Sequence, residues 1–361
     1  MKTLRIPINQ AVPGLVVAED IYSANNQLII SKNTILNRKI ITRLRFYLIN
    51  ELLIISESSK NQSDKPVVQE DNYSQVIRNS IEFKRFNEAF SESIGDFKTE
   101  LNNIANGQEP IDIAKLLEHT ARILAESRNG IHVFDMLHCM REFDDLTYVH
   151  SINVALICNV FGNWLKMTSE EIDNLTLSGL LHDIGKLKLP THILNKPNVL
   201  TSAEYTVVKT HTVKGYQLLK NHSLDTHVKY ATLMHHERCD GSGYPNAFHG
   251  ASIDPFAKIV AIADVYDAMT SARVYRPALS PFESIANFEK EGYQKYDPHY
   301  LIAFLEGIVQ CYIGKRVRLS NYAEGTIILI NKQSLSRPVI QVGERFIDLS
   351  KKPNLSIQAL I

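Results

Sequence analysis

The sequence contains few cysteines, and these are scattered. Its 361 residues include four of them, Cys139, Cys158, Cys239 and Cys311, and no two form a CxxC pair. This spacing argues against a disulfide framework and against a thiolate zinc site. Any bound metal should therefore have nitrogen and oxygen ligands.

Long apolar runs and an excess of charge are also missing. No segment approaches the ~20 apolar residues of a membrane span, and the stretch MKTLRIPINQAVPGLVV lacks the apolar core of a signal peptide. We therefore expect no membrane insertion and a cytoplasmic location. The 39 basic residues balance the 39 acidic ones, so no overall field favours a nucleic-acid partner. An anionic substrate would have to be bound by local charges.

Hydrophobic periodicity divides the chain into regions of different structure. Short apolar runs between turn residues predict a small β-rich N-terminal domain over 1–57, and a polar stretch predicts a linker over 58–77. Helical patterns fill 78–310, and β-type runs return over 311–361, where they predict a small meander or barrel. The expected fold class is mainly α, a helical bundle with small β-rich segments at both ends.

Several helix starts can be predicted from capping chemistry. The sequences TSEE (168–171), TSAE (201–204) and SPFE (280–283) have the form of a capping box, and the DP pair at 254–255 starts another helix. In each case a short polar side chain can satisfy the unpaired amides of the first helical turn.

Histidines and aspartates recur at intervals through the helical region. Successive positions are 24 to 32 residues apart, about one helix plus its connection. They are His150, His182, Asp183, His211, His235, His236 and Asp264. The surrounding helices are apolar nearly all round, and burying an unpaired polar group costs several kcal/mol. The pattern therefore predicts that these side chains converge in one interior, where a metal would be their partner.

The number of candidate ligands favours two metal ions. Seven nitrogen and oxygen donors exceed the need of one tetrahedral zinc with an open position. Two ions roughly 3.5 to 4 Å apart, bridged by an aspartate and by hydroxide, would clamp the attacking and leaving oxygens of a phosphoryl displacement. The donor set suits Fe, Mn, Zn, Ni or Co without choosing between them. Lys186, Arg273 and Arg276 are nearby cations that could bind phosphate.

Five motifs in a fixed order connect this chain to a known family. HDIGK, LNKP, VKTHTVKG, HHERCDGSGYP and IADVYDAMTSARVYR together resemble the HD-GYP family, a branch of the HD phosphohydrolases, over about residues 130–310. The resemblance implies an HD-type helical catalytic domain over 130–310, preceded by a helical connector over 78–129. It also implies a bacterial signalling phosphodiesterase that hydrolyses cyclic di-GMP to linear pGpG, which many members cleave further to GMP, with iron or manganese at a two- or three-metal centre. Whether pGpG or GMP is the end product here stays open.

The resemblance also assigns roles to single residues. The seven histidines and aspartates match metal ligands, with Asp183 and Lys186 at the catalytic centre and Lys186 contacting the scissile phosphate. Arg273 and Arg276 match residues that hold the dinucleotide, and Asp267 is a neighbouring polar support that the resemblance counts among the substrate-binding residues. Tyr244 shapes the substrate pocket. One departure is Leu146, which stands where three-metal members carry a glutamate. Because leucine cannot ligate, two ions are expected here.

Other interpretations remain open at this point. The substrate could be a mixed cyclic GMP-AMP, or the chain could be a non-catalytic receptor for cyclic di-GMP. Gly241, Gly243 and Pro245 could simply end a helix, with Glu237 and Asp240 fixing the loop. A homodimer and GGDEF-type signalling proteins are the expected protein partners.

Overall fold

The fold was taken from a computed structural model, in which the chain divides into two units, Met1–Gln69 and Glu70–Ile361. The residues it describes are 2–8, 11, 15–22, 28–36, 40, 41, 44, 49, 51–56, 73–107, 110–140, 146–196, 199–271 and 279–361. Each unit has its own hydrophobic core.

The first unit is built from short antiparallel strands. They are β1 (Lys2–Pro7), β2 (Ile21–Tyr22), β3 (Leu28–Ile30) and β4 (Glu51–Ser56). β1 pairs with β4 so that Ile6 lies opposite Leu52, and β2 pairs with β3. Alternate side chains of a strand point to opposite faces, which is why Leu52 and Ile54 are both buried in the core of this unit.

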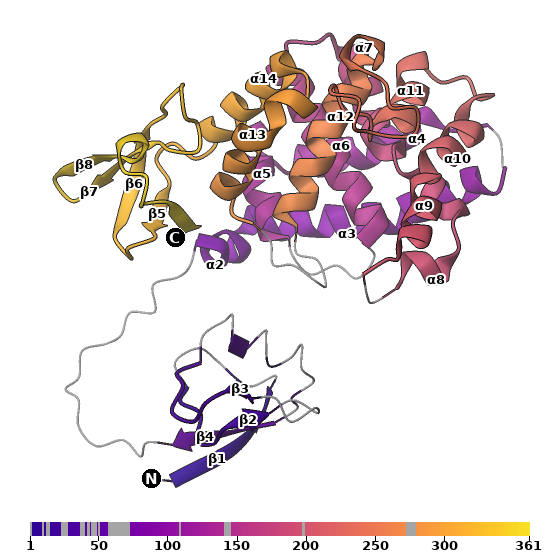
Figure 1. Cartoon of the computed structure of the whole chain (residues 1–361). Helices are drawn as coiled ribbons and strands as arrows, with labels where there is room; N and C mark the ends of the chain where they lie inside the picture. Colours follow the sequence, from indigo (N-terminus) through magenta and orange to yellow (C-terminus); the bar gives the residue numbers. More distant parts are fainter. Residues whose placement is uncertain are drawn as a thin grey trace. The chain divides into compact units, whose positions relative to one another are not determined.

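The second unit is mainly helical (Figure 1). In chain order its long elements are α2 (Tyr73–Asn79), α3 (Ile81–Ala105), α4 (Ile113–Ala125), α5 (Gly130–Cys139), α6 (Leu146–Trp164), α7 (Ser169–Leu181), α9 (Ser202–Lys209), α10 (His211–Leu219), α11 (Thr226–Met234), α12 (Pro255–Thr270), α13 (Pro281–Lys295) and α14 (Pro298–Gln310). Shorter helical turns are η2 (Ile184–Lys188), α8 (Thr191–Leu194) and η3 (Gly250–Ser252). The mainly α fold predicted from the sequence is confirmed.

The helix starts agree with the predicted capping chemistry. Complete capping boxes, with hydrogen bonds in both directions, begin α7 at Thr168, α9 at Thr201 and α13 at Ser280. Asp254 caps α12 ahead of a proline in its first turn. Local sequence therefore fixes where the helices that carry or support the site begin.

Four helices form the centre of the second unit. α6 packs against α7 and α12, and α11 packs against the same two helices. α6 and α12 lie side by side in the middle of Figure 1, with α8, α9 and α10 to one side. The buried face of α6 is almost wholly apolar, so the few polar side chains that enter this bundle are conspicuous.

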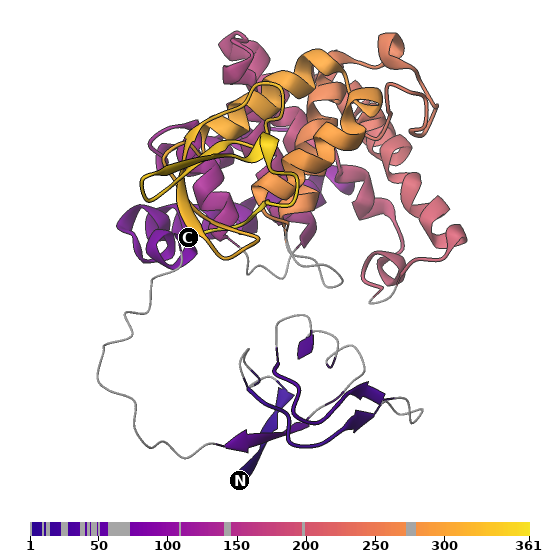
Figure 2. The same ribbon diagram turned by 60° about the vertical axis from the view of Figure 1, so that its left-hand side comes forward.

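A small antiparallel sheet follows the last helix. Its strands β5 (Arg316–Leu319), β6 (Glu324–Leu329), β7 (Val339–Val342), β8 (Arg345–Asp348) and β9 (Ile357–Leu360) have the order β8-β7-β6-β5-β9, and η4 (Leu349–Lys351) follows β8. Figure 2 turns this sheet, in yellow, to the front, over helices that it covers. Its buried residues Val317, Ile327 and Ile340 belong to the same hydrophobic core as the helices.

A polar junction fastens this sheet to the helices. Asp135 of α5 is buried, and its Oδ2 accepts a hydrogen bond from Nζ of Lys315 (2.8 Å), just before β5. Oδ1 of Asp135 accepts from the hydroxyl of Tyr73 at the start of α2. Three segments far apart in the sequence thus meet at one carboxylate.

The domain boundaries predicted from the sequence stay predictions, but the structure adds detail to them. Residues 73–77, predicted as linker, lie in α2, and the predicted segment 311–361 shares the core of the helices. Among the residues described, none of the helices is both long and apolar enough to cross a bilayer.

Candidate metal centre

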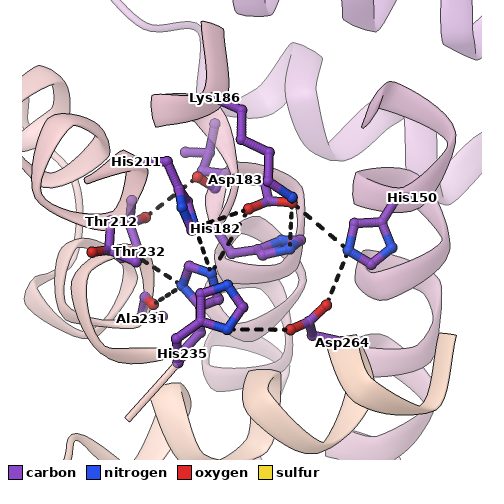
Figure 3. A network of polar contacts seen from close by, with 12 residues as sticks. His150, His182, Asp183, Lys186, His211, Thr212, Ala231, Thr232, His235 and Asp264 are labelled. Atoms are coloured by element: carbon purple, nitrogen blue, oxygen red, sulfur yellow. Dashed lines mark hydrogen bonds and ion pairs between the residues drawn. The ribbon is translucent and has the colours of Figure 1, made fainter. Parts of the chain in front are cut away.

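Seven polar side chains enter the interior of the central bundle from five segments. His150 lies on α6, His182 directly follows α7, Asp183 precedes η2, His211 begins α10, His235 and His236 follow α11, and Asp264 lies on α12. Figure 3 shows His150, His182, Asp183, His211, His235 and Asp264 directed toward one another. The structure thus brings together all seven residues that the sequence singled out as ligands.

The seven residues fall into two groups of potential metal ligands. One contains Asp183, His211, His235 and His236, and the other contains His150, His182 and Asp264; within each group the ligand atoms lie within 4.8 Å of one another.

Asp183 lies between the two groups, and its two oxygens face different ones. Oδ1 lies 3.3 Å from Nε2 of His211 and 3.8 Å from Nε2 of His235. Oδ2 lies 3.3 Å from Nε2 of His182 and 3.7 Å from Nε2 of His150. This is the geometry of a carboxylate that can bridge two cations.

Backbone carbonyls set the proton positions of three histidines. Nδ1 of His182 donates to the carbonyl oxygen of Gly179 (2.7 Å), and Nδ1 of His211 donates to that of Val208 (2.7 Å). Nδ1 of His235 lies 3.1 Å from the carbonyl oxygens of both Ala231 and Thr232. Since a carbonyl can only accept, these rings carry their proton on Nδ1 and present the lone pair of Nε2 to the cluster, which is the arrangement of metal-ligating histidines.

The unpaired atoms of the cluster fit metal ions. Nε2 of His182 and Oδ1 of Asp183 are buried without a hydrogen-bond partner. Nε2 of His211 lies 3.3 Å from Nε2 of His235, although neither nitrogen carries a proton to share. Buried acceptors facing one another are costly unless a cation lies between them. The donor set therefore fits a metal centre.

Charge keeps the two carboxylates of the cluster ionised. Burial disfavours the carboxylate of Asp183, but the charge of Lys186 and the neighbouring histidines outweigh it and hold the pKa well below its ordinary value. Burial acts in the same way on Asp264, and the hydrogen bond and charge of His150 again hold that pKa well below its ordinary value.

The histidines respond to burial in two ways. Burial lowers the pKa of His236 to about 3 and holds that of His235 well below its ordinary value, so both rings are neutral and able to ligate. Burial also opposes a charge on His150, but hydrogen bonds to Asp264 and Asp267 prevail and raise its pKa to about 9. The carboxylates that stabilise a proton on His150 would equally stabilise a metal cation at its Nε2.

Comparison with known proteins identifies the family that this centre belongs to. The family model described as HD domain matches residues 116–300, just over half of the chain. The chain belongs to the HD domain family. This confirms the resemblance inferred from the five motifs, and it assigns the buried histidine and aspartate cluster to an HD domain.

Several curated proteins are similar to part of this chain. Cyclic di-GMP phosphodiesterase PA4108 of Pseudomonas aeruginosa is 34% identical over 205 residues, which are 56% of this chain and 49% of the relative. The 3'3'-cGAMP-specific phosphodiesterase 1 of Vibrio cholerae is 42% identical over 134 residues, 37% of this chain and 31% of the relative. A cyclic di-GMP phosphodiesterase of Thermotoga maritima is 33% identical over 197 residues, 53% of each chain. The chain thus spans about half or less of the length of these relatives.

A solved structure shows the same fold. Bd1817, an HDG"Y"P protein from Bdellovibrio bacteriovorus, superposes with a TM-score of 0.50 at 14% sequence identity, covering 84% of this chain and 98% of that one.

Asp267, which the resemblance placed with the substrate-binding residues, contacts His150 beside the HD centre, the cluster of seven histidines and aspartates described above. Its Oδ2 accepts from Nδ1 of His150 (2.7 Å), and its Oδ1 accepts from Nδ2 of Asn153 (2.9 Å) and from Oγ of Ser271 (3.1 Å). The carboxylate is buried, with both oxygens occupied, on the side of His150 away from the cluster. It is placed to orient His150. The spacing of three residues from Asp264 puts both aspartates on one face of α12, a signal that the sequence did contain.

The other predicted site residues lie at the edge of the HD centre or outside the described residues. Nζ of Lys186 donates a hydrogen bond to Oδ2 of Asp183. The ring of Tyr244 lies 4.7 Å from that of His236, and burial, followed by the nearby Tyr205, raises the pKa of its phenol. Arg273 and Arg276 lie outside the described residues, as does the side chain of Leu146, which is the first residue of α6.

Glu237 organises the loop that carries Tyr244. It is buried, and its two carboxylate oxygens accept hydrogen bonds from the backbone N–H groups of Asn246 (2.7 Å) and Phe248 (3.0 Å). A Cβ on Gly243 would lie 2.4 Å from the backbone nitrogen of Arg238, so this position requires glycine. The GYP segment is therefore held against the two histidines that precede it.

Proposed function

We propose that this chain is a phosphodiesterase that hydrolyses cyclic di-GMP to pGpG and on to GMP at a two-metal centre. The observation that carries the proposal is the position of Asp183, whose two oxygens face two separate groups of buried ligands. Two divalent cations held in this way would polarise a phosphodiester and activate a water molecule at neutral pH. The names of the relatives support this substrate class.

The first group of ligands would be His211, His235 and His236, the second would be His150, His182 and Asp264, and Asp183 would serve both. The donors are imidazole and carboxylate alone, a set that suits iron and manganese. We propose one of these two metals, in line with the family resemblance.

The remaining residues would act on the substrate through charge and shape. The ammonium of Lys186 lies against Asp183, beside the position a scissile phosphate would take, where it would stabilise negative charge that develops on a phosphoryl oxygen. Tyr244 keeps its proton because its pKa is raised, so it would offer a neutral ring for stacking with a base. Asp267 would keep Nδ1 of His150 protonated and its Nε2 directed inward.

A mixed cyclic GMP-AMP is a second candidate substrate, because a relative that is 42% identical over 134 residues is named for it. Offering both cyclic dinucleotides together and following their decay by chromatography would give the ratio of the two kcat/KM values. The third interpretation, a non-catalytic receptor, is less well supported, since all seven ligand residues and Lys186 are in place.

The proposal is tested with anaerobically purified protein loaded with iron or manganese. Incubation with cyclic di-GMP should produce pGpG and GMP, and Asp183→Asn should abolish both products. Asp173→Asn, on the exposed face of α7, is the matched control and should leave turnover unchanged. A protein that contains its metals but releases neither pGpG nor GMP would refute the proposal. A homodimer, GGDEF-type partners and a cytoplasmic location stay predictions.

A further inference from the structure

Lys209, at the end of α9, lies between two tyrosine rings beside the HD centre. Its Nζ is 5.4 Å from the ring centroid of Tyr205 and 5.8 Å from that of Tyr244. Lys209 is half-buried, whereas Tyr205 is 49% exposed, so one side of this arrangement faces solvent. Lys209 lies within the motif VKTHTVKG, but no role was predicted from the sequence for Lys209 or for Tyr205.

The ammonium of Lys209 has no acidic partner within the part of the chain that the structure describes. Among the residues that the structure describes, no carboxylate forms an ion pair with it, although Glu204 lies on the same helix. Glu204 is already engaged, because both of its oxygens accept hydrogen bonds from Nζ of Lys196 (2.7 and 2.6 Å). A partly desolvated cation without a counter-charge favours an anionic ligand.

The position of Lys209 relates it to the metal centre. It is two residues before His211, and the ring of Tyr244, which it faces, lies 4.7 Å from the ring of His236. Lys186, in contrast, contacts Asp183 within the ligand cluster. Two lysines thus approach the centre at different points, one at the ligands and one beyond the Tyr244 ring.

We propose that Lys209, held by Tyr205 and Tyr244, binds the second phosphate of the dinucleotide, the one that is not being cleaved. A dinucleotide substrate has two phosphates, and only one of them can occupy the metal centre. A compact ammonium with freely rotating donors suits a phosphate oxygen. This inference rests on the proposed function for its choice of substrate, and it makes Lys209 a determinant of selectivity for substrates with two phosphates.

The test compares substrates with one and two phosphates. With metal-loaded Lys209→Met we expect KM for cyclic di-GMP to rise about tenfold, the usual effect of losing one charge-assisted hydrogen bond, while kcat changes little. Hydrolysis of bis(p-nitrophenyl) phosphate, which has one phosphate, should be unchanged. Lys209→Arg should recover most of the loss. Lys220→Met, at the exposed end of α10, is the control for removing a positive charge and should behave as the unaltered protein.

Four outcomes would overturn the inference. An unchanged KM for every dinucleotide, linear or cyclic, would show that Lys209 does not bind substrate. A fall in metal content or an equal loss on both substrates would indicate a structural role. A changed preference between guanine and adenine dinucleotides, with KM for cyclic di-GMP unchanged, would indicate base contact instead. An unaltered protein that cleaves neither substrate would overturn both proposals. If it cleaves bis(p-nitrophenyl) phosphate but no cyclic dinucleotide, the proposed function alone fails, and the comparison is then made with linear pGpG.

Discussion

Replacing Asp267 with asparagine should weaken metal binding without removing any ligand. The carboxylate accepts hydrogen bonds from His150 (2.7 Å), Asn153 (2.9 Å) and Ser271 (3.1 Å). Asparagine offers one accepting oxygen and one N–H₂ group in the same place. If the oxygen faces His150, the amide of Asn153 meets another donor. If it faces Asn153, Nδ1 of His150 loses its acceptor, and the ring can move its proton to Nε2, where metal would bind.

The size of the effect follows from these contacts. The first orientation leaves one buried donor without a partner, which costs about 1–3 kcal/mol. The second places the proton of His150 on the nitrogen that would bind metal. Loss of the group that orients a ligating histidine typically lowers metal affinity or activity ten- to a hundredfold, about 1.4–2.7 kcal/mol. We therefore expect Asp267→Asn to need about ten to a hundred times more manganese for half-maximal hydrolysis.

The assay titrates metal into metal-free protein and follows both metal content and phosphodiester hydrolysis. Saturating manganese should restore most of kcat, because the ligands themselves remain. Asp173→Asn should match the unaltered protein throughout. If instead KM for the dinucleotide rises while metal affinity stays the same, Asp267 contacts the substrate, as the family resemblance implied, and the orienting role is wrong.

Three further changes test the architecture around the HD centre. Gly185→Ala should lower both metal content and Tm, because the added Cβ would lie 1.9 Å from the carbonyl oxygen of His211. The control Gly95→Ala should lower neither, because no atom lies within 4 Å of its added Cβ. Equal Tm values for the two variants would contradict this prediction. Glu237→Gln deprives one buried N–H of its acceptor at a cost of about 1–3 kcal/mol. We expect a higher KM for the cyclic dinucleotide with unchanged metal content. A fall in metal content would indicate that Glu237 supports the metal ligands instead. Removing metal with a chelator should lower Tm reversibly, since the Nε2 atoms of His211 and His235 then face each other unshielded; an unchanged Tm would argue against a metal there.

The ligand cluster could be predicted from the sequence because its residues recur at intervals of about one helix and stand in the ordered motifs of a family. Two polar pairs, His182 with Asp183 and His235 with His236, stand at the ends of helices with apolar residues around them. Burying a polar group there is costly unless it has a partner. The capping boxes were equally local, since each joins residues three apart. The polar pairs and the capping boxes depend on neighbours in the chain, which the sequence displays directly.

Features that depend on distant neighbours could not be predicted in the same way. Asp267 and His150 are 117 positions apart in the sequence, and neither local sequence shows that the carboxylate of Asp267 accepts a hydrogen bond from His150. Lys209 stands in a motif, but the sequence does not show that Glu204 on the same helix accepts hydrogen bonds from Lys196 instead. Only the structure shows that Lys209 forms no ion pair with any described carboxylate. The alternation of apolar and polar residues predicted the strands after residue 315, but it did not predict which helices these strands pack on.

The junction at Asp135 has a consequence for dissecting the chain. A fragment that ends at residue 310 would delete Lys315 and leave a carboxylate that is 4% exposed without its cation. Losing a hydrogen bond to a charged group costs about 1.5–3 kcal/mol, a noticeable share of the ~5–15 kcal/mol that keeps a typical protein folded. The apolar side chains under the sheet would become exposed as well. A fragment of the helical unit should therefore keep Lys315 and the C-terminal strands together with the helices that they cover.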